Sequence, residues 1–317
     1  MTAIRFDQVS LQFPGAPYPS VNCCSCDIEP GKLVVILGPS GCGKTTLLKM
    51  VNRLYEPTSG TIYLEGTDIR QIKATTLRKQ IGYVIQQSGL FPHMTVAQNV
   101  AVVPKLLGWN RSQIQTRVHE LLILVDLPPN DYRDRYPAQL SGGQQQRVGL
   151  ARALAGNPNV MLMDEPFGAI DAITRTSLQD EILRLQRHLK KTILFVSHDV
   201  EEALRLADYL LIMREGAIVQ YDRPFNVLTK PANAFVRELL GADDTVRQLS
   251  LLRVETVMVE TLESDRHLPT VKRNDSLRHA LSLILKTGAP QLTVVENGVA
   301  VGVLTLDHIR NAARMSV

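Results

Sequence analysis

The chain has 317 residues, of which 44% are hydrophobic and 21% charged, an ordinary composition for one large or two average folded domains. A formal net charge of +4 without a long basic block argues against nucleic acid as a partner. No apolar run reaches the ~18 residues that span a bilayer, and the segment MTAIRFDQVS does not resemble a signal peptide. We therefore expect a cytoplasmic chain that meets a membrane only through another protein.

The first expected element is an antiparallel strand over residues 4–13, where apolar and polar side chains alternate. Two roles stay open for Phe13, which either packs within this strand or lies flat on an adenine ring. The next segment crowds Cys23, Cys24 and Cys26 together. Because the chain has 4 cysteines and no ligand cluster at zinc-site spacing, we interpret them as reduced strand residues.

A glycine-rich turn follows the buried strand that is expected over residues 33–37. Glycines allow the backbone to curl so that successive N–H groups point inward, and the helix expected from Thr46 turns its positive end the same way. The pattern predicts a phosphate-binding loop, in which Lys44 reaches the β- and γ-phosphates and Thr45 holds Mg²⁺. The residues assigned to it are Gly38, Pro39, Ser40, Gly41, Cys42, Gly43, Lys44, Thr45 and Thr46.

Three further apolar strands are expected to end in polar side chains: at Gln86, at Asp164 with Glu165, and at His198. Each alone fits a solvated strand end, but ligands gather at the carboxyl ends of parallel strands, so together they favour a nucleotide site. Gln86 would touch Mg²⁺ or the attacking water, and His198 the γ-phosphate. Because neighbouring strand side chains point in opposite directions, we expect Asp164 to bind Mg²⁺ and Glu165 to polarise the water.

Residues 97–127 are expected to be helical with a break at 108–110, and residues 126–136 to form a loop. The segment LSGGQ then begins another helix, whose exposed backbone N–H groups make a second anion site. Because this site lies far beyond Lys44 in the chain, we interpret it as reaching across a dimer to the partner's nucleotide. Its assigned residues are Ser141, Gly142, Gly143 and Gln144.

The C-terminal part of the chain is expected to form a strand over 267–271, an amphipathic helix over 275–287 and a hairpin that turns at 296–298. A unit of this size cannot bury much surface alone. We therefore expect it to pair with a partner.

In chain order, the segments GPSGCGKT, Gln86, LSGGQ, MLMDEP, FGAID and SHD resemble the nucleotide-binding subunit of an ATP-binding-cassette (ABC) transporter, over about residues 4–241. The resemblance implies an α/β fold: a P-loop NTPase core of mainly parallel sheet with an antiparallel β subdomain and a helical subdomain at about 88–150. We place the domain boundary between 1–241 and 242–317.

The same resemblance implies a dimer of two copies, arranged head to tail around two ATP molecules. Each ATP would lie between Lys44 of one copy and Ser141 and Gly143 of the other, with Asp171 at the dimer seam. The loop from Gln87 to Thr95 would receive the coupling helices of transmembrane permease subunits. A substrate-binding protein is implied indirectly, and the subunit would sit peripherally on the cytoplasmic face of the plasma membrane.

Two segments narrow the resemblance to one subgroup. MVNRL followed by EPTSG resembles importers of osmoprotectants such as glycine betaine, choline, carnitine or proline, and residues 251–309 resemble a small α+β CBS motif. CBS motifs normally pair, and with one motif here the pairing would join two subunits. The family's ribose-binding acid falls three residues after Thr305, where this chain has His308, with Asp307 one step early. A regulatory nucleotide, sensing of ionic strength and simple dimerisation all stay open for this tail.

The resulting functional prediction is an ATPase that powers solute import by in-line attack of water on the γ-phosphate. Lys44 would stabilise charge, Glu165 would act as the base, and His198 would sense the γ-phosphate; Thr45, Gln86 and Asp164 would organise Mg²⁺. The alternatives are an ABC importer ATPase for another small solute, or a non-transport ABC ATPase. The second usually fuses two cassettes or inserts a long coiled coil, and neither occurs between residues 46 and 140.

Overall fold

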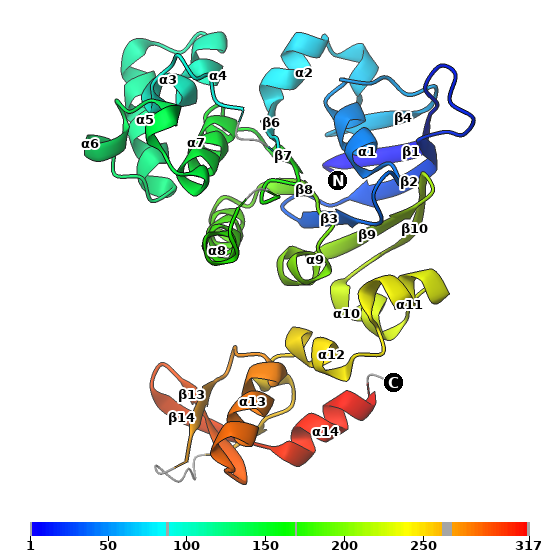
Figure 1. Cartoon of the computed structure of the whole chain (residues 1–317), viewed down its shortest axis with the longest axis vertical. Helices are drawn as coiled ribbons and strands as arrows, with labels where there is room; N and C mark the ends of the chain where they lie inside the picture. The colour runs from blue at the N-terminus through cyan, green and yellow to red at the C-terminus, as the bar shows by residue number, and fades with distance from the viewer. Residues whose placement is uncertain (1, 87–88, 169, 262–267, 316–317) are drawn as a thin grey trace. The chain divides into compact units, whose positions relative to one another are not determined.

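The computed structural model describes residues 2–86, 89–168, 170–261 and 268–315. Contacts divide the chain into two units, 1–221 and 222–317, which are described separately (Figure 1). Contacts group α10 (Pro224–Thr229) and α11 (Ala234–Leu240) with the second unit, whereas the sequence-based boundary groups them with the first. Within the described residues, no helix is both long and apolar enough to cross a membrane.

The main sheet of the first unit has six strands in the order β10-β9-β3-β8-β7-β6. Each of the pairs β3 with β8, β3 with β9, β7 with β8 and β6 with β7 is parallel, so these strands share one carboxyl edge. All five residues of β3 and of β8 are buried, which explains why every residue of the two strands except Thr192 is apolar. The strands are β3 (Leu33–Leu37), β6 (Ile81–Val84), β7 (Val160–Asp164), β8 (Thr192–Val196), β9 (Tyr209–Arg214) and β10 (Ala217–Asp222).

A second, antiparallel sheet has the order β2-β1-β4-β5. Its apolar face, α1 and the main sheet contribute to one hydrophobic core, represented by Phe6, Leu47 and Val34. This confirms the predicted α/β fold with an antiparallel β subdomain. The elements are β1 (Ile4–Leu11), β2 (Val21–Ile28), α1 (Lys44–Val51), β4 (Ser59–Leu64), β5 (Thr67–Asp68), the 3₁₀ turn η1 (Ile69–Gln71) and α2 (Ala74–Gln80).

A helical region lies beside β6 and β7, at the upper left of Figure 1. Within it, α7 packs against α3, α4 and α5. The loop predicted over 126–136 is partly wrong, because it contains the short helix α6, which starts at a proline whose fixed φ suits a first helical turn. The helices are α3 (Val96–Val100), α4 (Val102–Leu106), α5 (Arg111–Leu124), α6 (Pro129–Tyr132), the 3₁₀ turn η2 (Pro137–Gln139) and α7 (Gly142–Leu154).

Two helices return the chain to the main sheet: α8 (Ala172–Leu189), which follows β7, and α9 (Val200–Leu206), which follows β8. Each is capped by an aspartate directly before it. Asp171 accepts a hydrogen bond from the N–H of Thr174, and Asp199 accepts one from the N–H of Glu202. Both capped turns therefore start at the carboxyl edge of the sheet.

The second unit has its own hydrophobic core and a four-stranded sheet in the order β11-β14-β13-β12. The predicted hairpin is confirmed, with Asn297 and Gly298 both at positive φ between antiparallel strands. Of the strand predicted over 267–271, residue 267 lies outside the described residues. The elements are α12 (Thr245–Leu251), η3 (Val254–Thr256), β11 (Val259–Glu260), β12 (Thr270–Lys272), α13 (Leu277–Thr287), β13 (Gln291–Glu296), β14 (Val299–Thr305) and α14 (Leu306–Met315).

Candidate active site

The glycine-rich turn after β3 is shaped by close backbone approaches. A Cβ on Gly38 would lie 2.3 Å from the carbonyl oxygen of Met213, and one on Gly43 would lie 2.2 Å from that of Ser20. Gly43 also has a positive φ and directly precedes α1, which starts at Lys44, two residues before the predicted position. Only glycine fits these two positions, so the turn packs its backbone directly against the backbone at Met213 and Ser20.

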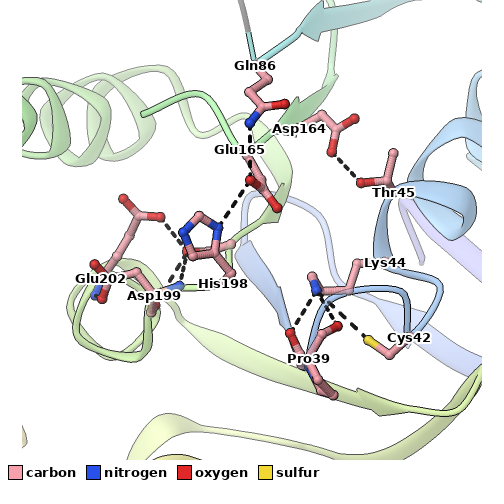
Figure 2. Close-up of polar contacts among 12 residues, drawn as sticks. Pro39, Cys42, Lys44, Thr45, Gln86, Asp164, Glu165, His198, Asp199 and Glu202 are labelled. Atoms are coloured by element: carbon pink, nitrogen blue, oxygen red, sulfur yellow. Dashed lines mark hydrogen bonds and ion pairs between the residues drawn. The ribbon is translucent and has the colours of Figure 1, made fainter. Parts of the chain in front are cut away.

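Lys44 is held inside this turn. Its Nζ donates hydrogen bonds to the carbonyl oxygens of Gly38, at 2.7 Å, and Pro39, at 2.9 Å, and the residue is 6% exposed (Figure 2). The thiol of Cys42 lies 4.0 Å from the same Nζ and is itself buried. Burial raises the pKa of the Cys42 thiol above its ordinary value, so the turn carries one positive charge and no thiolate.

Thr45 and Asp164 form the next pair of the site. The hydroxyl of Thr45, in the first turn of α1, donates to Oδ1 of Asp164, at the end of β7, over 2.8 Å. Burial raises the pKa of the Asp164 carboxyl, and the hydrogen bond from Thr45 opposes that shift. A hydroxyl and a carboxylate side by side are oxygen donors of the kind that Mg²⁺ prefers. The residues present therefore fit a magnesium ion.

Glu165 lies at the centre of a second cluster. Its Oε2 accepts a hydrogen bond from Nε2 of Gln86, at 3.5 Å, and lies 3.1 Å from Nδ1 of His198. Figure 2 shows Gln86 and His198 converging on this carboxylate from opposite sides. Three side chains from the ends of three different strands thus meet at one oxygen.

The backbone at Glu165 differs from the extended strand that the sequence suggested. Strand β7 ends at Asp164, and Glu165 has φ +44°, in the left-handed region that non-glycine residues rarely adopt. Asp164 therefore ends the strand and Glu165 starts the turn that follows it, so the strand-alternation argument for their different roles was wrong. Such a conformation persists only where surrounding structure holds it, and here the N–H of Glu165 donates to the carbonyl oxygen of Val196 in β8.

The second predicted anion site is the start of α7. Ser141 and Gln144 form a reciprocal capping box, in which Ser141 Oγ accepts from the N–H of Gln144 and Oε1 of Gln144 accepts from the N–H of Ser141. A Cβ on Gly142 would meet nothing within 4 Å, whereas one on Gly143 would lie 2.5 Å from Cγ2 of Thr174. In the view of Figure 1, α7 and α1 lie on opposite sides of β6 and β7.

Two other predicted residues have structural partners. Phe13 packs edge to face against Tyr55, with ring centroids 5.2 Å apart, a partner that the sequence gave no reason to single out. Asp171 caps α8 and is exposed. The adenine contact of Phe13 and the dimer-seam role of Asp171 stay predictions.

In the loop proposed for permease contact, residues 87 and 88 lie outside the described part of the chain, and the rest is held by the buried side chain of Asn99. Its Oδ1 accepts from the N–H of Phe91, and its Nδ2 lies 3.1 Å from the carbonyl oxygens of Phe91, Met94 and Thr95. Arg152 of α7 donates to the carbonyl oxygen of Gly89. Phe91 is 40% exposed, so the loop presents an aromatic ring on a fixed backbone.

Comparison with known proteins agrees with this geometry. A profile of the ABC transporter family matches residues 21–168, and a CBS domain profile matches residues 259–314. The glycine betaine/carnitine/choline transport ATP-binding protein OpuCA of Bacillus subtilis is 48% identical over 294 residues, covering 92% of this chain and 75% of OpuCA. The glycine betaine uptake system ATP-binding protein YehX of Escherichia coli is 48% identical over 293 residues, covering 92% of this chain and 94% of YehX.

Among solved structures, the dimeric post-hydrolysis state of the ATP-binding cassette MJ0796, bound to ADP and Pi, superposes with a TM-score of 0.62 at 29% identity. The match covers 70% of this chain and 98% of that one. With relatives of this identity along nearly its whole length, the chain belongs to the ABC transporter family, in which it is an ATP-binding ATPase subunit.

Proposed function

We propose that this chain hydrolyses ATP in a head-to-tail dimer and thereby powers uptake of a quaternary-amine osmoprotectant through separate membrane subunits. The observation that carries the catalytic part is the convergence of Gln86 and His198 on the carboxylate of Glu165, beside the Thr45–Asp164 pair. The solute class is supported by OpuCA and YehX, both named for glycine betaine. Their matches cover 92% of this chain, which is more than the cassette alone contains.

The chemistry follows from where the side chains lie. A water aligned by Glu165 attacks the γ-phosphorus in line, the bond to the β–γ bridging oxygen breaks, and Glu165 takes the proton of the water. His198, 3.1 Å from the same carboxylate, is placed to donate toward a γ-phosphate oxygen. The positive charge of Lys44 and the N–H groups of the loop offset the charge on the phosphates.

Magnesium is part of this proposal. Thr45, Asp164 and the amide oxygen of Gln86 would hold the ion, which would neutralise charge on the phosphate oxygens when bound. The hydrogen bond from Thr45 to Asp164 keeps both oxygens together at the end of β7. Asp164 is half buried, and this is the environment in which a carboxylate gains most from a nearby cation.

The dimer is supported by the places of the two predicted anion sites in one chain, because α7 and α1 lie on opposite sides of β6 and β7 in the view of Figure 1. Ser141 and Gly142 are exposed at the start of α7, on a different part of the fold from the loop that holds Lys44. A second copy placed head to tail would bring its α7 to the nucleotide, with Asp171 near the seam. MJ0796 supplies a dimeric precedent among structures with the same fold.

The further partners are transmembrane permease subunits, with Phe91 in the contact, and through them a substrate-binding protein. The chain would then sit on the cytoplasmic face of the plasma membrane. In the tail, Thr305 and His308 hydrogen-bond reciprocally through backbone N–H and side chain, so they form a capping box at the start of α14, with His308 where the ribose-binding pattern has an acid. We assign the tail a pairing role between two copies, and a regulatory nucleotide at the CBS-like domain is the competing outcome.

The proposal is tested by reconstituting the full chain with the permease and binding protein that co-purify with it, in vesicles. We expect ATP-dependent uptake of labelled glycine betaine, carnitine or choline, and none when Glu165→Gln replaces the wild-type chain. Uptake confined to a sugar, a metal ion or sulfate would refute the solute class and leave the ATPase assignment standing. Co-purification with ribosomes or DNA instead would support a non-transport ABC ATPase.

A further inference from the structure

The turn that carries His198 is fixed by its two neighbours in the chain. Ser197 is 2% exposed, and its Oγ accepts a hydrogen bond from the N–H of Asp199 at 3.0 Å. The same hydroxyl donates to Oε2 of Glu202 at 2.5 Å, and Oδ1 of Asp199 accepts from the N–H of Glu202. The backbone on both sides of His198 is therefore tied to the first turn of α9.

Glu202 ties this turn to a second helix as well. Its carboxylate is buried, and Oε1 accepts a hydrogen bond from Nε2 of Gln179, in the middle of α8, at 3.0 Å. Gln179 is 5% exposed and accepts in turn from Arg205 at 3.2 Å. Each carboxylate oxygen of Glu202 thus accepts a hydrogen bond, one from the His198 turn and the other from α8.

We call the group formed by Ser197, Asp199, Glu202 and Gln179 the clamp. Two ion pairs between α8 and the chain around α9 surround it. Nη1 of Arg175 in α8 lies 3.5 Å from Oδ2 of Asp199, and Nη2 of Arg205 in α9 lies 2.7 Å from Oδ1 of Asp180 in α8. Burial raises the pKa of Glu202, and the hydrogen bonds from Ser197 and Gln179 oppose that shift. A buried carboxylate is costly unless its hydrogen bonds are made, so the arrangement has one well-defined geometry.

The clamp and the catalytic carboxylate border the same small pocket, which is lined by Glu165, Ser197, His198 and Glu202 among others. Figure 2 shows Asp199 and Glu202 on the side of His198 that faces away from Gln86. By contrast, the side chain of His198 is itself 59% exposed, and its Nδ1 lies 3.1 Å from Oε2 of Glu165. An exposed ring on a short turn needs its backbone held if it is to stay within 3.1 Å of a carboxylate.

We propose that Glu202, acting through Ser197 and Gln179, is a positioning residue that holds His198 against Glu165 for ATP hydrolysis. This inference rests on the proposed function, because it concerns the same γ-phosphate site. Neither Glu202 nor Gln179 touches the reacting atoms. Their effect on hydrolysis passes through the placement of His198, so it disappears when His198 is absent.

The experiment measures steady-state ATP hydrolysis by the full chain. Glu202→Leu keeps the volume of the side chain and removes both hydrogen bonds, and Ser197→Ala removes one hydroxyl and disturbs packing little. We expect each to lower kcat about tenfold or more, with KM for ATP within about twofold of wild type, because small misplacements of a catalytic group cost up to ~10²-fold. Glu202→Gln, which can remake both hydrogen bonds, restores most of the activity. Glu201→Gln, an exposed neighbour on α9, is the matched control.

A double-mutant cycle separates positioning from general destabilisation. In a His198→Ala background, Glu202→Leu and Ser197→Ala should cause no further loss of kcat, and the side-chain NMR signal of His198 should move in both single variants but not in Glu201→Gln. Equal losses in the two backgrounds, or wild-type kcat in both single variants, would overturn the positioning role. If Glu202→Leu does not fold, Ser197→Ala alone decides. Absence of hydrolysis in the wild-type chain would contradict the proposed function instead.

Discussion

The chain has two predicted anion-binding features of different character, the loop before α1 and the start of α7. In the first, the buried Lys44 and the half-buried Asp164 hydrogen-bond to groups of their own chain. In the second, Ser141 and Gly142 are exposed, Gly143 and Gln144 are half-buried, and none of the four titrates. The loop before α1 therefore has charged groups that can take part in a reaction. The start of α7 can only form hydrogen bonds with a ligand that another part of the assembly supplies.

The largest expected effect is on the rate of ATP hydrolysis, and it tests whether the catalytic groups lie only beside the loop before α1. Glu165→Gln keeps the hydrogen-bonding shape and removes the base, so we expect kcat to fall about 10³-fold, in the range of general-base contributions. ATP binding, measured by equilibrium titration, should change little. Wild-type-like turnover in this variant would refute the role of Glu165, and Glu201→Gln serves as the control for a glutamate-to-glutamine change on an exposed surface.

The next prediction concerns the second feature. Gly142 has open space around a built Cβ, so Gly142→Ala should fold normally and gain up to about 1 kcal/mol of stability from better helix propensity. If a partner's nucleotide packs on this position, the added methyl group should nevertheless reduce hydrolysis, by about tenfold. A variant that is more stable and fully active would argue against any contact there.

Gly143→Ala provides the contrast. Its Cβ would lie 2.5 Å from Cγ2 of Thr174 in the same chain, so we expect lower thermal stability as well as lower activity. The measurement is the thermal unfolding temperature of the two variants. Opposite changes would show that Gly143 is constrained by its own chain and that any constraint on Gly142 comes from the partner chain.

A smaller effect concerns how α7 is held. Arg147 of α7 lies 3.3 Å from Oε2 of Glu181 in α8, and burial raises the pKa of Glu181 from 4.5 to about 7. The folded chain then binds more protons than the unfolded chain between those pH values, so this residue's contribution to stability falls as pH rises toward 7. Glu181→Gln should remove that decline and be more stable than wild type at pH 8, by about 1–3 kcal/mol.

The measurement is the midpoint of thermal unfolding at pH 5 and pH 8. The two proteins should unfold at similar temperatures at pH 5 and separate at pH 8, with the variant higher. A variant that is less stable than wild type at pH 8 would mean that the charged Arg147–Glu181 pair stabilises the junction of α7 and α8.

The smallest effect concerns Cys42, inside the first feature. Because its thiol is buried and its pKa is raised, alkylation by iodoacetamide should be at least about tenfold slower than alkylation of the exposed Cys23, as followed by mass spectrometry. Equal rates would show that the loop opens readily in solution.

The sequence predicted the parts of the site that depend on topology. The sequence predicts a common edge for Gln86, Asp164 and His198 once the sheet is parallel. The structure places Asp164 at the end of β7, and Gln86 and His198 each two residues beyond the last residue of their strands, Val84 and Val196. The phosphate-loop glycines and the Ser141 cap were predictable for a different reason. Their spacing in the sequence determines the local backbone geometry.

The features of the site that the sequence did not predict depend on contacts between residues that are far apart in the chain. The left-handed backbone at Glu165 is stabilised from β8, and the clamp on His198 requires Gln179, which the sequence places in an unremarkable stretch of α8. Tyr55 against Phe13 is a similar case. From the sequence, a polar residue such as Gln179 within a helix cannot be distinguished from one on a solvated face without knowing what packs there.

The central claim is that each site is completed by α7 of a second copy, and mixed dimers test it directly. Lys44→Ala and Ser141→Arg chains, each carrying a different affinity tag, are expected to be nearly inactive alone. In an equimolar mixture, pairing at random leaves one intact site in half of the dimers, so hydrolysis should recover to about a quarter of the wild-type rate. A mixture no more active than its two components would contradict the composite site.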